Sequence, residues 1–137
     1  MRYRFEKDLE SGIILINVQL DGKHTFKMVL DTGASRTTID TTALYMADYK
    51  VNNMSKTSAI ETANGIIEVE VIEVNSLMAL GHSKHRMQVQ VYDFLAHGIL
   101  SDYDGLLGLD FFEDTAFCID LKNNNIEIFQ DEKHIFI

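Results

Sequence analysis

Apolar and polar residues alternate with a period of two along most of this chain, and tight turns separate the alternating runs. The pattern is clearest in residues 14–20, 25–30 and 87–91. Such alternation is typical of β-strands that place one face in a core. Asp21-Gly22 and Asn64-Gly65 are strong signals for two-residue hairpin turns. The chain is therefore predicted to be all-β, a barrel or a sandwich.

Further elements follow from the same reasoning. The longest expected strand changes its apolar parity between Val71 and Ile72, which predicts a bulge or a bend. A short helix is expected from Asp40, as its N-cap, to Asp48, with Leu44 and Ala47 facing inward. A second short helix is expected from about Asp110. A turn is predicted at 81–83, and residues 135–137 are apolar enough to pair at the edge of a sheet. The predicted strands are 14–20, 25–30, 57–63, 66–80, 87–91, 105–108, 117–121 and 126–129.

Composition limits the classes of function. The 137 residues make one domain, 1–137, and their net charge of −9 makes nucleic acid and anionic membranes poor partners. The charged N-terminus does not resemble a signal peptide, and no apolar run approaches the ~20 residues of a membrane span, so we expect a cytoplasmic protein. The single cysteine, Cys118, is expected to be a buried apolar residue that forms no intrachain disulfide.

Three short motifs carry the chemistry. The run Leu30-Asp31-Thr32-Gly33-Ala34-Ser35 ends a strand in an acid, a hydroxyl and a glycine, Ala63-Asn64-Gly65 is a hairpin tip, and Gly105-Leu106-Leu107-Gly108 is an apolar strand end. A water held between two carboxylates that share one proton can hydrolyse a peptide bond. Glycine permits the tight turn that presents such a carboxylate, and the threonine hydroxyl can fix that turn by local hydrogen bonds.

In this order, the motifs resemble those of the retropepsin-like aspartic proteases, in their single-domain bacterial and cellular branch, over about residues 13–129. The resemblance implies a closed β-barrel with one or two short helices and a hydrolase that acts on a peptide or protein substrate without a cofactor or metal. It also implies a homodimer, because only one Asp-Thr-Gly is present and each chain supplies half a site.

The resemblance assigns residues as well. Asp31, Thr32 and Gly33 would form the catalytic loop, and the hairpin around Asn64-Gly65 would be a flap that closes on the substrate. Ala34, Ala63, Ile66 and Leu107 would join them in lining the substrate site. Retroviral members carry an arginine soon after the hydrophobic-hydrophobic-glycine element, whereas Gly108 is followed here by Leu109 and Asp110. The arginine-centred network that braces the retroviral dimer is therefore not expected.

Other chemistry-bearing residues have simpler interpretations. Asp102, Asp104 and Asp110 are interpreted as turn and cap residues, and His82 and His85 have no third metal ligand at a suitable spacing. Two other functions remain open. One is a non-catalytic peptide- or protein-binding or assembly module that keeps this fold. The other is an unrelated ligand-binding β-barrel, which would be a monomer.

Overall fold

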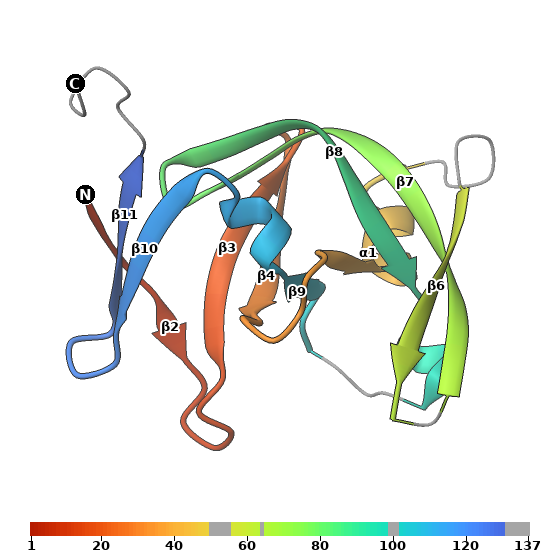
Figure 1. The fold of residues 1–137 in the computed structure, drawn as a ribbon, viewed down its shortest axis with the longest axis horizontal. Helices are drawn as coiled ribbons and strands as arrows, with labels where there is room; N and C mark the ends of the chain where they lie inside the picture. Colours follow the sequence, from red (N-terminus) through yellow and green to blue (C-terminus); the bar gives the residue numbers. More distant parts are fainter. Residues whose placement is uncertain (50–55, 64, 99–101, 131–137) are drawn as a thin grey trace.

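A computed structural model describes residues 1–49, 56–63, 65–98 and 102–130, and six of its strands close into a barrel. Around the barrel, each strand is hydrogen-bonded to the next, and the ring closes where the last strand pairs with the first (Figure 1). The order is β3 (Ile14–Leu20), β4 (His24–Leu30), β9 (Gly105–Leu107), β5 (Thr38–Asp40), β8 (His82–Tyr92) and β7 (Gly65–Ala79). The prediction of a closed, mostly β barrel is confirmed.

Two tight turns connect long strands of the barrel. Asp21, Gly22 and Lys23 join β3 to β4, so the hairpin lies where Asp21-Gly22 predicted it but its turn has three residues; Asp21 and Gly22 have positive φ angles, 54° and 69°. Leu80 and Gly81 join β7 to β8 with φ angles of 54° and 70°, so β8 begins at His82 and the turn predicted at 81–83 lies earlier. A leucine is rarely found in this conformation, and the long β7–β8 pairing holds it there.

Two parallel pairings place the loop that carries Asp31 in the barrel wall. β4 is parallel to β9, and β5 is parallel to β8 while lying antiparallel to β9 on its other side. The segment 31–37 joins β4 to β5, so it begins and ends at strands that both pair with β9. β5 could not be predicted from the sequence, because its three residues are too few to show a period.

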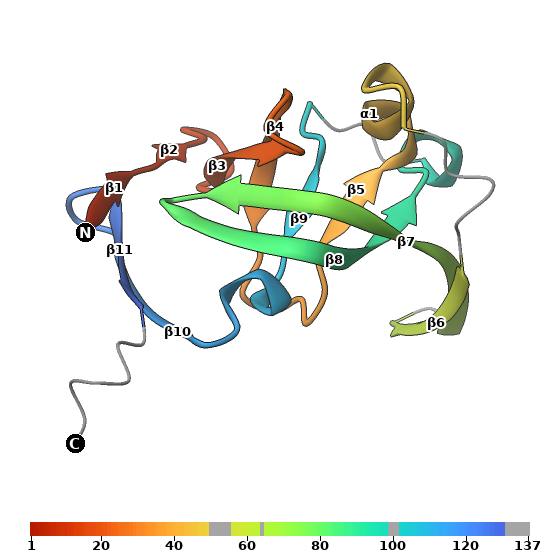
Figure 2. The ribbon, with the colours of Figure 1, turned by 90° about the horizontal axis from the view of Figure 1, so that it is seen from above.

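The remaining strands form two extensions at opposite ends of the molecule (Figures 1 and 2). At one end, β6 (Lys56–Thr62) pairs with the first part of β7 as a hairpin. At the other, β1 (Arg2–Arg4), β11 (Asn125–Gln130) and β10 (Thr115–Asp120) form a three-stranded sheet. The short β2 (Glu6–Lys7) pairs with β3. Residues 135–137, predicted to pair at an edge, lie outside the described residues.

Short helices connect the strands: α1 (Thr41–Met46) and two 3₁₀ turns, η1 (Leu95–His97) and η2 (Leu109–Phe112). Leu44 and Ala47 are buried, as predicted. Asp40 is the N-cap residue of α1, as predicted, but its carboxylate makes no capping bond and accepts a hydrogen bond from the Phe94 amide instead, at 3.1 Å. No helix in the described part of the chain is long and apolar enough to cross a membrane.

The barrel interior is one hydrophobic cluster, to which Val18, Leu20 and Val74 contribute fully buried side chains. Val71 and Ile72 are both buried, so the parity of β7 changes where the sequence predicted. The register with β8 runs without interruption from Glu70 to Val74. The change therefore involves no bulge: Val71 and Ile72 point to opposite faces of the sheet, and both faces are covered at this point.

The expectation that Cys118 is buried is wrong. Cys118 is exposed on β10, whereas its neighbours Phe117 and Ile119 are half-buried and pack against the core. Successive side chains of a strand point to opposite faces. Only one face of this strand is covered, and the period of two places Cys118 on the other.

The surroundings of Gly105 show how closely the strands of the barrel wall approach one another. A Cβ atom at this position would lie 2.2 Å from the Thr38 carbonyl oxygen and 3.0 Å from Ile39 Cα. Because the clash is with backbone, Gly105→Ala is expected to lower the free energy of unfolding by about 3 kcal/mol, measured by urea denaturation. Gly22→Ala is the control, since a Cβ there meets nothing within 4 Å and costs only its positive φ, about 1 kcal/mol. Equal losses for the two variants would contradict the packing argument.

Candidate active site

The loop that follows β4 fixes the carboxylate of Asp31 through its own backbone. The Asp31 amide donates to the Leu107 carbonyl at 3.0 Å, and the Ala34 amide donates to the Asp31 carbonyl at 3.1 Å. The Gly33 amide donates to Asp31 Oδ1 at 3.0 Å. Asp31 is half-buried, while Thr32 and Gly33 are exposed. The result is a carboxylate in a defined orientation beneath a tight, accessible turn.

The Gly105–Gly108 segment supports this loop from behind. Past β9, the Leu109 amide donates to the Ala34 carbonyl at 2.9 Å. A Cβ on Gly108 would lie 2.6 Å from both the C and O atoms of Arg36. Glycine is therefore needed at this position, since any side chain would push the loop away from β9.

Asp110 is a positioning residue that the sequence analysis interpreted only as a turn or cap residue. Both of its carboxylate oxygens lie 3.0 Å from the Thr37 amide, and Oδ1 also accepts a hydrogen bond from the Thr37 hydroxyl at 2.7 Å. The same hydroxyl accepts a hydrogen bond from the Gly108 amide at 3.1 Å. Thr37 is completely buried. Asp110 thereby joins η2 to the C-terminal end of the Asp31 loop.

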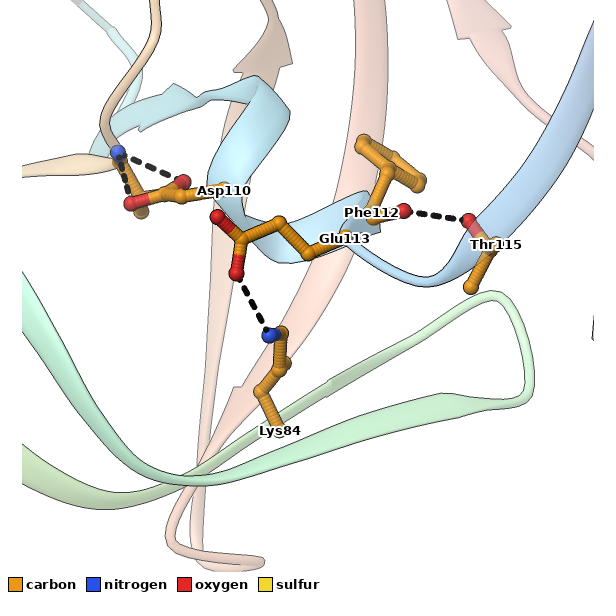
Figure 3. Close-up of polar contacts among 6 residues, drawn as sticks. Lys84, Asp110, Phe112, Glu113 and Thr115 are labelled. Atoms are coloured by element: carbon orange, nitrogen blue, oxygen red, sulfur yellow. Dashed lines mark hydrogen bonds and ion pairs between the residues drawn. The ribbon is translucent and has the colours of Figure 1, made fainter.

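Aromatic and ionic contacts hold η2 itself in place. Phe111 is completely buried, and its ring meets His82 edge to face at 5.1 Å, while Phe112 packs on Phe117 at 4.4 Å. Lys84 on β8 forms an ion pair with Glu113 at 3.3 Å (Figure 3). The support beneath the Asp31 loop is thus connected to both β8 and β10.

The structure divides the predicted site residues into two groups. Hydrogen bonds connect Asp31, Gly33, Ala34 and Leu107 in or beneath one loop, which also contains Thr32. Leu107 is completely buried, so its side chain belongs to the core and its carbonyl supports the loop.

The second group lies on the β6–β7 hairpin. Ala63 and Gly65 are exposed there, and Ile66 has an exposed fraction of 74%. Asn64 lies outside the described residues, although the pairing of Thr62 with Gly65 shows the hairpin on either side of it. Among the residues that are described, no group of three or more His, Cys, Asp or Glu side chains could hold a metal ion.

A closed six-stranded barrel whose wall carries an Asp-Thr-Gly loop, supported by Gly-Leu-Leu-Gly, defines the class of this domain as that of the acid proteases. Comparison with known proteins agrees. The family model described as Aspartyl protease matches residues 16–111. The chain therefore belongs to the aspartyl protease family and is an aspartic peptidase.

A solved structure shows the same fold. The crystal structure of a retropepsin-like aspartic protease from Rickettsia conorii matches with a TM-score of 0.69 and 23% sequence identity, over 94% of this chain and 91% of that chain. The retropepsin-like fold expected from the motifs is thereby confirmed. A search of curated proteins found no match.

The Thr37–Asp110 contact leads to a prediction about stability. Asp110→Ala leaves the buried Thr37 amide and hydroxyl without their acceptor, so the free energy of unfolding is expected to fall by about 2–3 kcal/mol. Asp110→Asn keeps one acceptor oxygen, so its free energy of unfolding should fall by less than that of Asp110→Ala. Asp102→Ala, which removes an exposed carboxylate, should stay within about 0.5 kcal/mol of the unmodified protein. Urea denaturation measures all three, and equal values for Asp110→Ala and Asp102→Ala would refute a supporting role.

His82 predicts how stability depends on pH. Burial lowers the pKa of His82 from its usual 6.5, as does the charge of Lys84, while a hydrogen bond with the Phe111 backbone partly offsets them. The unfolded chain therefore binds a proton at a higher pH than the folded chain does, and stability falls as the pH drops below 6.5. In His82→Gln, the loss of stability between about pH 7.5 and about pH 5 should be smaller. Urea midpoints at both pH values measure it, and the exposed His85→Gln, as control, should keep the full loss.

Proposed function

We propose that this peptidase is a homodimeric endopeptidase in which Asp31 and its counterpart in a second copy activate one water molecule. The proposal rests on the observation that one chain supplies only half of a two-carboxylate active site. The sequence contains one Asp-Thr-Gly, and the loop presents Asp31 with its carboxylate fixed by Gly33 and its tip, Thr32-Gly33, exposed. A twofold axis at this tip would bring two such loops together and complete the pair of carboxylates.

The chemistry follows from the pairing. Two carboxylates ~3 Å apart share one proton, because like charges at that distance cannot both ionise. The ionised carboxylate takes a proton from the water as its oxygen attacks the peptide carbonyl carbon, and the protonated one gives its proton to the carbonyl oxygen. The tetrahedral intermediate then collapses: the carboxylate that gave up its proton takes one back from a hydroxyl of the intermediate, the C–N bond breaks, and the nitrogen receives a proton from the carboxyl group that had accepted one. The products are a carboxyl and an amino terminus.

The β6–β7 hairpin suits the role of a flap over this pair. Its described tip residues, Ala63 and Gly65, are exposed, and Gly65 has a φ of 121°, which favours glycine. Ile66, next to the tip, presents a large apolar side chain that is 74% exposed. A peptide lying extended between the hairpin and the loop would meet Ala34, Ala63, Asn64, Gly65 and Ile66, and closure over it would exclude water.

Asp31→Asn tests the proposal. The variant keeps the shape of the side chain and an oxygen that can accept the Gly33 hydrogen bond, but it cannot act as a base, so cleavage of a diverse peptide library should fall at least a thousandfold, to about the background rate. Specific activity of the unmodified protein should rise with protein concentration as dimers form, and sedimentation should show the same dimer in Asp31→Asn.

The outcomes separate the competing functions. Equal cleavage by both proteins would remove Asp31 from the chemistry. Peptide binding by a dimer that never cleaves would favour a binding or assembly module. A monomer that neither binds nor cleaves peptides would favour the unrelated ligand-binding barrel.

A further inference from the structure

Beside the Asp31 loop, the surface is hollowed and its lining carries one more permanent cation than anions, although the protein as a whole carries a net charge of −9. The hollow has a volume of about 440 Å³ and lies between the end of the loop, β8 and η2. Its lining residues are Ser35, Arg36, Lys84, His85, Arg86, Met87, Gln88, Asp110 and Glu113. Three of them are permanent cations and two are anions.

The two anions of the lining already interact with neighbouring residues. Both oxygens of Asp110 accept hydrogen bonds from Thr37, and Glu113 is paired with Lys84 (Figure 3). Arg86 extends into solvent, with its side chain 83% exposed, and lies 3.8 Å from Glu73, which is outside the hollow.

Arg36 differs from the other cations. Its exposed side chain makes no hydrogen bond or ion pair with the described residues, whereas its backbone is held against Gly108. Its main chain is thus fixed and its guanidinium is free to take a ligand. A guanidinium binds a carboxylate through two parallel hydrogen bonds, which favours carboxylates over neutral groups.

From this arrangement, we infer that the hollow is a specificity pocket in which Arg36 binds an acidic side chain of the peptide substrate. This inference deepens the proposed function and rests on it, because it requires the substrate peptide to cross the loop of Asp31.

The position of the pocket sets where the acidic residue lies. The chain from Asp31 to Arg36 spans at most about 17 Å, and an extended peptide advances about 3.3 Å per residue. The acidic residue therefore falls within about five residues of the bond that is cut. In a twofold dimer the hollow occurs once on each protomer, so an acidic preference is expected on both sides of that bond.

Matched peptides that carry Glu or Gln at one position test the inference. For the unmodified protein, kcat/KM should be about two- to fivefold higher with Glu at a position that reaches the pocket, as expected for an exposed ion pair. Added salt should reduce this ratio. Arg36→Gln should bring the ratio to one, and Arg36→Glu should reverse it in favour of Lys at the same position. Lys122→Gln, which removes an exposed charge from the β10–β11 turn, should leave the ratio unchanged.

Binding to Asp31→Asn separates this inference from the proposed mechanism. Fluorescence anisotropy with the same Glu and Gln peptides should show the two- to fivefold preference without any cleavage. The same preference in binding, combined with an unmodified protein that cleaves none of the peptides, would refute the proposed mechanism and keep the pocket. Equal binding and equal kcat/KM for Glu and Gln peptides at every position, or a preference that Arg36→Glu leaves intact, would overturn the pocket.

Discussion

The structure depends on the close approach of two backbones, that of β9 with the following Gly108 and that of the segment from Ala34 to Ile39. At Gly105 and at Gly108, a single added carbon would lie 2.2 and 2.6 Å from backbone atoms of that segment. The approach lets the Leu107 carbonyl and the Leu109 amide bond to the Asp31 loop. The same contact thus closes the barrel wall and orients the carboxylate, so stability and site geometry cannot vary independently here.

Support for the loop is distributed over distant parts of the chain. Asp110 binds Thr37, Phe111 packs on His82, and Lys84 pairs with Glu113. Through these contacts, the loop of Asp31 is connected to β8 and, by way of η2, to β10. Under the proposed dimeric mechanism, a carboxylate that meets its counterpart in a second copy would benefit from such rigid support, because catalytic groups act only within a narrow range of positions.

Much of this architecture could be predicted from the sequence, because strand periodicity and turn residues are local signals. β3, β4 and β11 lie close to their expected ranges, and Asp21-Gly22 turns as expected. Non-local features could not be predicted. β5 has three residues and exists only through its neighbours β9 and β8, while Leu80 occupies a turn position that its residue type disfavours. The period of two indicated that Cys118 and Phe117 lie on opposite faces, but the sequence did not show that one face stays uncovered.

The candidate site shows the same division. The Asp-Thr-Gly motif identified the loop, because its chemistry is contained in adjacent residues. The supporting role of Asp110 depends on its hydrogen bonds with Thr37, which lies 73 residues earlier, and no local sequence pattern indicates that pairing. Leu107 was expected from the resemblance to line the substrate site, whereas its side chain is buried in the core.

The parallel pairing of β4 with β9 also has a consequence for how the protein is made. The Asp31 loop leaves the ribosome before its partners do, since the residue that binds Thr37 is synthesised 73 residues later. Until then, the loop lacks its backbone partners on β9, and contacts of such long sequence separation form slowly. A nascent chain therefore carries its Asp-Thr-Gly without this backbone support, so under the proposed mechanism the order of synthesis itself delays proteolysis.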